Sequence, residues 1–589
     1  MTNSVKESAF TEVLRLCRLS AFIAVFAVSA GVLTGCSIAS ADESVPANSG
    51  CFPMLLHMVH HNPGEPLFKT RLNDPGYIKE LGYSGQIPKI QIQCGVTFDK
   101  AFPGILPEQS QERLWIERHA HSVRLMMDNA RKQGMPIYPF LDMLVIPKPM
   151  MDKLGSKMKV NGRLSIMSET TEKVVRAQME ELFRRFPDIA GITLRHGETY
   201  LHDTPYHKGT SPVHTANEHA KLINILRDEI CVKRNKTLIY RTWGFGRNNI
   251  HTNSKNYLAA TNQVEPHPKL FFSTKHANAD YIRGIPFNTT MDKGKHQRIV
   301  EVSVNQAGLF GDSSSPYYIA KGVIEGWDEM ENPRGLRDFL KDSRIQGIWI
   351  WCYGDGWNGP YFNNELWMEV NEYVMRKYTL DPSKSEEVYF NQFATEELGL
   401  KGESLKKFRK LVMLATEASF IGQYTRVIRP WRGLEWWCRD HGIASFNVDP
   451  MVIKGKIQEA MEEKAKAVKM WKMAEAISKT VSLKDTRDTK FMRVSTTYGR
   501  IKYQVFEQVW KIELMLADER LNKKTADKAA LITAVKEYDK LFKEWRQLKR
   551  DNVCCPTLYF DNQADYGVKY GRAFGPVLQK LKKRLGLDK

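Results

Sequence analysis

Residues 192–200 of the chain read Ile192-Thr193-Leu194-Arg195-His196-Gly197-Glu198-Thr199-Tyr200. The apolar start of this stretch is typical of a buried parallel strand, and its polar end brings Glu198 next to Arg195 and His196. In a (β/α)8 barrel the loops that follow the strands line one shared face, where chemistry takes place. The stretch therefore predicts a strand whose tip contributes a carboxyl group to a polar pocket.

Seven further apolar runs, bounded by Gly, Pro and Asn, have the spacing of strands in the same barrel. Together the expected strands cover residues 53–59, 89–94, 136–144, 191–194, 237–242, 269–274, 298–304 and 347–351. Amphipathic segments such as 112–133 and 168–186 lie between them. Strict alternation of strand and helix predicts a parallel sheet, and eight units predict its closure. We therefore expect an α/β fold, a (β/α)8 TIM barrel over residues 51–382.

After Pro382 the pattern becomes helical, with long Lys- and Glu-rich amphipathic runs at 405–424, 452–481, 502–521 and 526–548. This indicates an all-α C-terminal domain over residues 383–589, with a packing role or a role in forming a homodimer. The alternative is that its basic and aromatic cluster reaches over the mouth of the barrel. That cluster consists of Arg426, Arg429, Trp431, Trp436 and Trp437.

The N-terminal segment indicates export. Arg15 and Arg18 precede an apolar run over 19–33, which ends in Leu33-Thr34-Gly35-Cys36. A small-residue site ending in Cys is similar to the lipobox of bacterial lipoproteins, so we expect a signal peptide over 1–36, lipidation of Cys36 and a flexible tether over 37–50. The protein is then held by its lipid at the bacterial cell envelope, on the outer membrane or its periplasmic face. The alternatives are an ordinary signal peptide cut after Ala41 and a retained membrane helix.

The charge and the cysteine content of the chain indicate which binding partners and cofactors to expect. The chain of 589 residues has 86 Lys+Arg against 67 Asp+Glu, a net charge of +19. For an exported protein this charge favours an acidic polysaccharide or an anionic membrane surface over nucleic acid, unless the Lys-rich helices are only solvated. Of the nine cysteines, none outside the signal has CxxC or Cys/His spacing, so neither a metal nor another cofactor is expected. Cys94 and Cys352 fit core positions.

The ends of the expected strands are unusually polar. Aromatic rings beside amides and charges suit sugars, whose C–H faces stack on rings while their hydroxyls need hydrogen-bond partners. Any one of these side chains alone is more often structural, but their recurrence at one end of many strands favours a site. The candidate substrate-binding residues are Arg195, His196, Arg241, Trp243, Lys275, His276, Asn305, Asp355, Trp357 and Asn358.

With these strand tips, the chain resembles the α-glucuronidases of glycoside hydrolase family 67. The likeness extends from about the fourth expected strand to Leu400. The resemblance rests on Glu198 after the fourth strand, Arg241-Thr242-Trp243 after the fifth, and Lys275-His276-Ala277-Asn278-Ala279-Asp280-Tyr281 after the sixth. The loop Gly354-Asp355-Gly356-Trp357-Asn358-Gly359 and the run Arg376-Lys377-Tyr378-Thr379-Leu380-Asp381-Pro382 also look similar. It implies a barrel with a helical domain, inversion at the anomeric carbon, Glu198 as general acid and Asp280 as the base that activates water.

Two departures from the family stand out. The family has a second candidate base after the seventh strand, and Ala307 stands at that position in the run Glu301-Val302-Ser303-Val304-Asn305-Gln306-Ala307-Gly308. The family's N-terminal α/β domain also has no counterpart here. The resemblance is therefore closer for the fold and the reaction than for glucuronic acid as the substrate.

Hydrolysis by two carboxyl groups requires one protonated and one ionised group at the same pH. Glu198 is our candidate acid, and Asp280, beside Lys275 and His276, the candidate base. A separation of about 6.5–9.5 Å would admit a water and give inversion. Glu301 is the alternative, as nucleophile of a retaining pair at about 5–5.5 Å. Glu301 lies between Val300 and Val302 in the expected strand, which instead suggests that it is buried and pairs with a cation at a strand tip.

Three functions follow in order of preference. The first is an exported glycoside hydrolase acting on an acidic polysaccharide or its oligosaccharides, with Arg195, Arg241 and Lys275 as partners of a uronate or sulfate group. The second is a surface glycan-binding lipoprotein that has lost its chemistry, suggested by Ala307. The third is a structural lipoprotein that assembles complexes through its helical domain.

Overall fold

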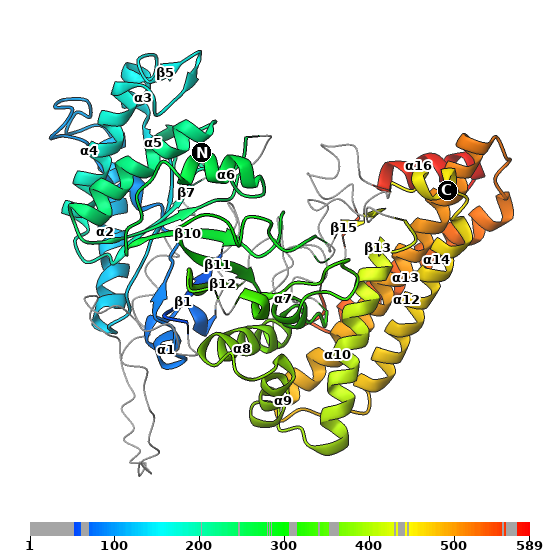
Figure 1. Cartoon of the computed structure of the whole chain (residues 1–589). Coiled ribbons are helices and arrows are strands. Elements are labelled where there is room, and N and C mark those ends of the chain that lie inside the picture. Colours follow the sequence, from blue (N-terminus) through cyan, green and yellow to red (C-terminus); the bar gives the residue numbers. More distant parts are fainter. Residues whose placement is uncertain are drawn as a thin grey trace, which may run out of the picture. The chain divides into compact units, whose positions relative to one another are not determined.

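Eight parallel strands form one sheet in the order β2-β1-β12-β11-β10-β9-β7-β3 (Figure 1). Its two outer strands are joined by a parallel bridge between Gln86 and Ile137, where the Tyr138 amide donates to the Gln86 carbonyl at 2.8 Å. Consecutive strands are therefore neighbours all the way round, and the expected (β/α)8 barrel is confirmed. The strands are β1 (Met54–Val59), β2 (Gly85–Gln86), β3 (Phe140–Asp142), β7 (Gly191–Arg195), β9 (Thr237–Arg241), β10 (Leu270–Lys275), β11 (Gln297–Ser303) and β12 (Ile345–Cys352).

The computed structural model describes residues 52–60, 70–201, 203–244, 248–279, 281, 283, 285–304, 315–339, 342–352, 364–428, 432–433, 442–443, 447–556, 559–560 and 574–588. All of them belong to one compact unit, Ser49–Lys589. The expected signal peptide, Cys36 and the tether lie outside the described residues. The same holds for Asp280, Asn305, Ala307, Asp355, Trp357 and Asn358.

One expected strand is wrong. The apolar run at 89–94 was predicted to be the second strand, but β2 ends at Gln86, and Ile92–Gly95 form a short 3-10 helix, η2. Pro88 has no amide hydrogen to donate to a neighbouring strand, although its carbonyl accepts from the Phe140 amide at 3.0 Å. Gln91 then turns the chain with a left-handed φ of 46°. The run is apolar because Ile92 and Cys94 are fully buried. Apolar character alone cannot distinguish a strand from a buried turn.

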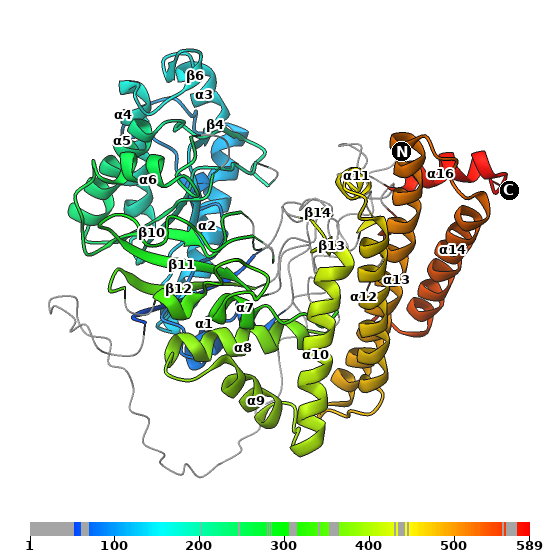
Figure 2. The same cartoon turned by 45° about the vertical axis from the view of Figure 1, so that its right-hand side comes forward.

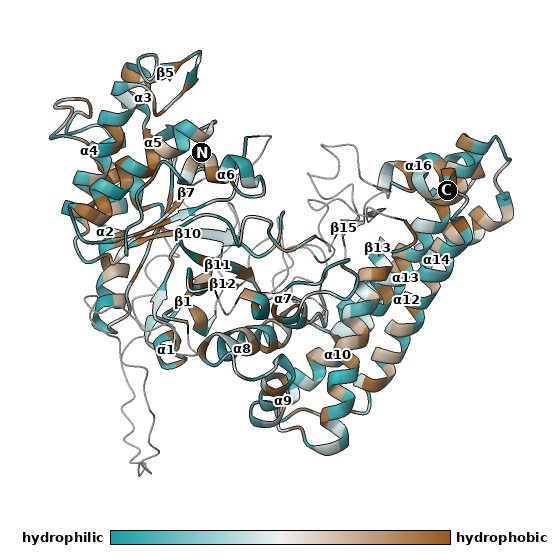
Figure 3. Cartoon of the chain, in the orientation of Figure 1, coloured by the Kyte–Doolittle hydropathy of each residue, from teal (hydrophilic) through white to brown (hydrophobic). Residues whose placement is uncertain are grey.

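The strands alternate between an interior and an exterior set of side chains, as a barrel requires. The interior set includes Leu56, Met58, Ile87, Phe140, Ile239, Phe271, Ile299, Trp349 and Trp351. Residues between them, such as Tyr240 and Val302, face outward into the layer beneath the helices. Figure 3 shows hydrophobic residues on the strands and along the helices that cover them.

Helices on the barrel follow the usual signals for their ends. Ser110, Ser168, Thr215 and Asn253 cap four of them by accepting a hydrogen bond from the backbone amide three residues later. The main helices are α1 (Pro75–Glu80), α2 (Gln111–Lys132), α3 (Lys148–Leu154), α4 (Glu169–Arg185), α5 (Ala216–Leu226), α6 (Ser254–Thr261), α7 (Ala320–Glu325) and α8 (Leu366–Leu380). The minor elements are η1 (Arg71–Asn73), η3 (Arg227–Val232), η4 (Leu336–Phe339), β4 (Val145–Pro147), β5 (Lys159–Val160), β6 (Arg163–Leu164) and β8 (His207–Gly209).

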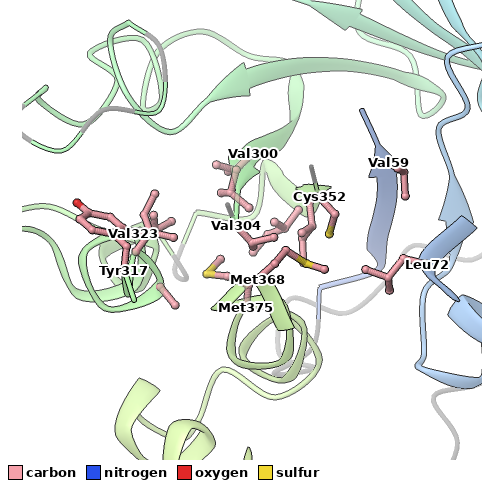
Figure 4. Close-up of a cluster of buried hydrophobic side chains, with 14 of the residues drawn as sticks. Val59, Leu72, Val300, Val304, Tyr317, Val323, Cys352, Met368 and Met375 are labelled. Carbon is pink, nitrogen blue, oxygen red and sulfur yellow. The ribbon is translucent and has the colours of Figure 1, made fainter. Parts of the chain in front are cut away.

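Figure 4 shows part of the layer between helices and barrel, where Val323 of α7 and Met368 of α8 gather against Val300 of β11 and Cys352 of β12. Cys94 and Cys352 are fully buried, as expected of core residues. Within the described residues, no helix has the length and apolar character that crossing a membrane requires.

The C-terminal part is helical, as predicted, and α10, α12, α13 and α14 lie side by side (Figure 2). Gly422 of α10 and Gly499 of α13 allow close packing, because a Cβ there would lie 2.4 Å from the Tyr503 ring and 2.3 Å from the Trp471 ring. The elements are α9 (Glu386–Glu396), α10 (Gly402–Gln423), α11 (Asp449–Ile453), α12 (Ile457–Ser478), α13 (Thr486–Asn522), α14 (Lys528–Asp551), α16 (Phe574–Leu585) and the short strands β13 (Tyr424–Thr425), β14 (Arg432–Gly433), β15 (Gly442–Ile443) and β16 (Tyr559–Phe560).

The barrel and the helices share a buried contact surface. The Trp367 indole of α8 donates to Ser495 Oγ of α13 at 2.9 Å, and both residues are buried. The Tyr318 amide donates to Thr416 Oγ1 of α10 at 2.7 Å. Buried polar groups are costly unless they are bonded, so these contacts fix the helices at defined positions on the barrel.

A double-mutant cycle on Trp367→Phe and Ser495→Ala tests this surface. We expect a coupling free energy of about 1 kcal/mol, because either single variant removes the bond between Trp367 and Ser495, and Ser495→Ala also leaves the Trp367 indole N–H buried and unbonded. In Trp367→Phe the Ser495 hydroxyl keeps its bond to the Met492 carbonyl at 3.3 Å. Urea unfolding of the four proteins measures it. Strictly additive losses would show that the hydrogen bond does not join the two parts.

Candidate active site

Charged side chains gather inside the barrel at the carboxyl ends of its strands. Asp142 ends β3, Arg195 ends β7, Arg241 ends β9, Lys275 ends β10, and Glu301 lies near the end of β11. All five are buried, with 0 to 3% of their surface exposed. Buried charges are stable in a protein when they are paired and hydrogen-bonded, so their partners determine what the site can do.

Arg195 and Asp142 form the first pair. These residues stand opposite each other in the β3–β7 register, and Arg195 donates from Nε to Oδ1 and from Nη2 to Oδ2, both at 2.6 Å. The Tyr200 amide adds a third hydrogen bond to Asp142 at 3.1 Å. The guanidinium lies over the Phe140 and Tyr200 rings at 5.0 and 4.2 Å. Burial alone would lower the pKa of Arg195, but the Asp142 carboxylate outweighs it and raises that pKa.

Arg241 and Glu301 form the second pair. Arg241 Nε donates to Glu301 Oε2 at 2.7 Å, and Nη2 donates to Oε1 at 2.5 Å. The Ser273 hydroxyl donates to Oε2 at 3.3 Å, and the Tyr281 hydroxyl donates to Oε1. Each oxygen of Glu301 thus accepts two hydrogen bonds, which is its full capacity. Glu301 therefore occupies the position of a buried partner of a strand-tip cation, the second of the two roles considered for it.

Glu198 lies in a different environment. Its side chain is 22% exposed, 3.5 Å from Arg195 Nη1, and it accepts a hydrogen bond from the Tyr200 hydroxyl at 3.2 Å. Gly197 permits the close approach of the neighbouring loop, because a Cβ there would lie 2.4 Å from the Trp243 carbonyl oxygen. Glu198 is thus the accessible carboxyl group beside two that are sealed in ion pairs.

Two further cations lie at the same end of the barrel. Lys275 Nζ is 3.4 Å from the centre of the Trp243 ring and 4.7 Å from that of Tyr281, so aromatic faces stabilise its charge. Lys89, after β2, lies over the Tyr200 ring at 5.0 Å. Burial and Arg195 lower the pKa of Lys89 to about 8, although Asp142, Glu198 and Asp203 act in the opposite direction.

The predicted substrate-binding residues divide into two groups. Arg195, Arg241, Trp243 and Lys275 are brought together, and each arginine holds a carboxylate. Within the described part of the chain, Arg241 Nη1 is buried without a hydrogen-bond partner, so the expected contact of these arginines with a uronate or sulfate stays a prediction. His196 points away from the barrel interior, against the rings of Tyr240 and His219 at 5.3 and 4.5 Å. This outward packing explains its burial and is a correction to its predicted contact with substrate.

His276 is also a packing residue. It is 6% exposed, its ring stacks on that of Tyr281 at 5.7 Å, and its amide donates to the Glu301 carbonyl. The cluster Arg426 to Trp437 lies largely outside the described residues, but the Arg426 side chain binds Glu417 and Glu329. Among the described residues, no three His, Cys, Asp or Glu side chains are arranged to hold a metal ion.

The sequence did not assign roles to Asp142, Tyr281, Ser273 and Lys89. Asp142 stands at a predicted strand tip, but only the β3–β7 register shows that it faces Arg195. Tyr281 and Ser273 acquire their roles from Glu301, 20 and 28 residues further along the chain. No local pattern encodes such distant pairing.

No protein-family model and no curated protein sequence matches this chain. A solved structure of a GH138 enzyme targeting pectin rhamnogalacturonan II is similar, with a TM-score of 0.55 and 13% identity, over 87% of this chain and 63% of that one. The chain thus spans less than two thirds of that enzyme's length. A mutant of the Thermobaculum terrenum O-GlcNAc hydrolase matches more weakly, with a TM-score of 0.38 and 9% identity over 91% of this chain and 94% of that one. Dispersin B matches with a TM-score of 0.31 and 12% identity over 57% of this chain and 97% of that one. The first match shows that the fold is one found in a glycoside hydrolase.

The burial of the second pair predicts a large loss of stability in Glu301→Gln. Removing one partner of a buried ion pair typically costs about 3–5 kcal/mol, because the remaining charge has no counterion. The matched control is Glu325→Gln, whose bidentate partner Arg337 is 36% exposed, so a loss below about 1 kcal/mol is expected. Equal losses in urea unfolding would contradict the buried pairing.

His276 predicts a dependence of stability on pH. Burial lowers its pKa to about 4, with Lys275 also lowering it and its contact with the Glu301 backbone acting against this. Between pH 6.5 and about 4 the unfolded chain therefore binds a proton that the folded chain does not, and stability falls as the pH falls through this range. His276→Gln should reduce that slope by up to about 1.4 kcal/mol per pH unit. His121→Gln, on the exposed side of α2, is the control, and equal slopes in both variants would refute the assignment.

Proposed function

We propose that the protein is a glycoside hydrolase in which Glu198 is the general acid. The observation that carries this proposal is the contrast between carboxyl groups at one end of the barrel. Asp142 and Glu301 are sealed in bidentate ion pairs, whereas Glu198 is 22% exposed and held by the Tyr200 hydroxyl. Carboxyl groups in such different environments can perform different tasks at one pH.

In the proposed reaction the glycosidic C–O bond breaks while Glu198 transfers its proton to the departing oxygen. A water molecule attacks the anomeric carbon from the opposite side and gives its proton to the base. The bound sugar keeps its position through the floor of the site, where Arg241 and Arg195 are locked by their carboxylates. A rigid floor lowers the reorganisation that the transition state requires.

The proposed base is Asp280, which directly precedes Tyr281 in the sequence. The alternative, Glu301 as nucleophile of a retaining reaction, requires an unoccupied oxygen lone pair. Its two oxygens already accept from Arg241, Tyr281 and Ser273. We therefore assign Glu301 to fixing Arg241 and Tyr281, and inversion to the reaction. The configuration of the first product, followed by NMR, decides between the two mechanisms.

The proposed substrate is an acidic polysaccharide or its oligosaccharides, including uronate-bearing ones as the α-glucuronidase resemblance suggests. The net charge of +19 supports this choice, together with Lys275 and Lys89 at the site. The GH138 enzyme of similar fold targets pectin rhamnogalacturonan II, so pectin fragments belong in any test panel. The proposal also places the enzyme at the cell envelope, anchored through Cys36, with the helical domain as a surface for a homodimer.

A second candidate is a glycan-binding protein without turnover. It is favoured by Ala307, which stands where the α-glucuronidases that the sequence resembles have a carboxylate. It is also favoured by Glu301, whose two oxygens already accept four hydrogen bonds within the protein. This protein would bind an oligosaccharide in a saturable manner and release no sugar after long incubation.

The decisive measurement is sugar release from uronate-bearing, sulfated and pectic substrates by the chain from residue 37 onward. Glu198→Gln should lose about 10²–10⁴-fold in turnover on substrates with poor leaving groups and little on aryl glycosides, which need no proton. Asp280→Asn should lose activity on both.

The control is Glu325→Gln, which removes a carboxylate from the outer surface of the barrel and should leave turnover unchanged. Full activity of Glu198→Gln on natural linkages would exclude Glu198 from the reaction. Saturable binding without release from any substrate would favour the glycan-binding protein.

A further inference from the structure

The chain after β10 forms a hairpin, which we call the β10 hairpin, residues 276–288. Ala277 and Phe287 pair in antiparallel fashion, the Asn278 amide donates to the Pro286 carbonyl at 3.0 Å, and the Asn288 amide donates to the His276 carbonyl at 2.8 Å. The base of the hairpin is thus fixed on the barrel. Its tip carries Asp280, Tyr281 and Arg283 in the sequence.

Tyr281 and Arg283 contact different parts of the protein. Tyr281 is 1% exposed, belongs to the interior set of the barrel and donates to Glu301. Arg283, two residues later, is 6% exposed and reaches α10 of the helical part. Tyr281 thus contacts the floor of the site, and Arg283 contacts the helical part.

The Arg283 guanidinium donates four hydrogen bonds. Nε and Nη2 donate to the two oxygens of Glu329 at 2.7 and 3.0 Å, and Nη2 also donates to Glu417 of α10 at 2.8 Å. Nη1 donates to the Thr416 carbonyl at 3.3 Å. The centres of the Trp327 and Phe420 rings lie 4.3 and 4.6 Å from Arg283 Cζ, so aromatic faces also contact the guanidinium.

This cluster is an ionic network. Glu417 also accepts from Arg426, and the Coulomb attraction of Arg283 and Arg426 lowers the pKa of Glu417 although burial acts against it. Glu329 is almost completely buried, so a displaced Arg283 would leave its carboxylate without its bidentate partner. The Arg283 side chain consequently has one strongly preferred position, set by Glu329 and by Glu417 of α10.

We propose that Arg283 is a positioning residue of the active site, through which the helical domain fixes the β10 hairpin at this point and, with it, Tyr281. The inference rests on the proposed hydrolase function for its catalytic part. Arg283 does not touch the reacting atoms; it acts through the hairpin. The helical domain is then a structural part of the active site and not a separate module.

The first test compares Arg283→Lys and Glu417→Gln with wild type in steady-state hydrolysis. Lysine cannot make the bidentate bond to Glu329 and the bond to Glu417 together, so we expect kcat to fall about 10- to 100-fold with little change in KM. The loss should be equal for aryl glycosides and for natural linkages, because the hairpin carries the proposed base and not the acid. A loss confined to poor leaving groups would overturn the proposal.

The matched control is Arg409→Lys. Arg409 lies on α10, as does Glu417, and binds Glu386 through two bonds of 2.7 and 3.4 Å beside the Phe390 ring. Among the described residues, its hydrogen bonds and ring contact do not reach the β10 hairpin. Its replacement should lower stability as Arg283→Lys does and leave kcat unchanged. An equal fall of kcat in both variants would mean that general destabilisation, and not positioning, is responsible.

Hydrogen–deuterium exchange separates this inference from the proposed function, because it needs no substrate. Peptides covering residues 276–288 should exchange faster in Arg283→Lys and Glu417→Gln than in wild type or Arg409→Lys. Unchanged exchange in these peptides overturns the proposal whatever the activity. Faster exchange in a protein that releases no sugar from any substrate would support the anchoring and reject the hydrolase.

Discussion

Arg195 and Arg241 bring two positive charges into the interior of a barrel that is otherwise packed with Ile, Phe and Trp side chains. In such surroundings a guanidinium is stable only with a carboxylate in fork-to-fork geometry, which Asp142 and Glu301 provide. The aromatic rings of Phe140 and Trp351 then pack against the guanidinium faces. These two ion pairs tie β3 to β7 and β9 to β11 across the mouth of the barrel.

The chemistry of the site follows from this constraint. Because Asp142 and Glu301 are committed to their arginines, the accessible carboxyl group among the described strand tips is Glu198. Its neighbours are fixed in turn, since the Tyr200 amide binds Asp142 and the Tyr200 hydroxyl binds Glu198. The site thus places one accessible carboxyl group beside two bidentate ion pairs, an arrangement consistent with the general acid catalysis proposed above.

The same floor connects the barrel to the helical part. Glu301 accepts from Tyr281, and the chain that carries Tyr281 continues to Arg283 and its partners on α10. Two residues close together in the sequence thus contact Glu301 inside the barrel and Glu417 of α10. Helices of this length could have been stabilised by their own apolar faces alone. The buried ionic network gives them a defined position relative to the candidate active site.

The sequence was sufficient for the architecture. Apolar runs ending in polar residues predicted seven of the eight strands, because burial on both faces of a parallel strand leaves a local signature, and helix periodicity predicted α10, α12, α13 and α14. The second strand was misplaced, since η2 is as buried as a strand and its apolar run looks the same.

The sequence also indicated that Arg195, Arg241 and Lys275 stand at the ends of strands, because a strand tip is defined by its own neighbours in the chain. Only the tertiary structure decided what those residues do. Whether Arg241 meets a substrate or Glu301, and whether His196 faces the pocket or Tyr240, depends on strand register and on which side of the sheet a side chain faces. Such pairings join residues 53 or 60 positions apart, and their energies depend on burial that no single segment can reveal.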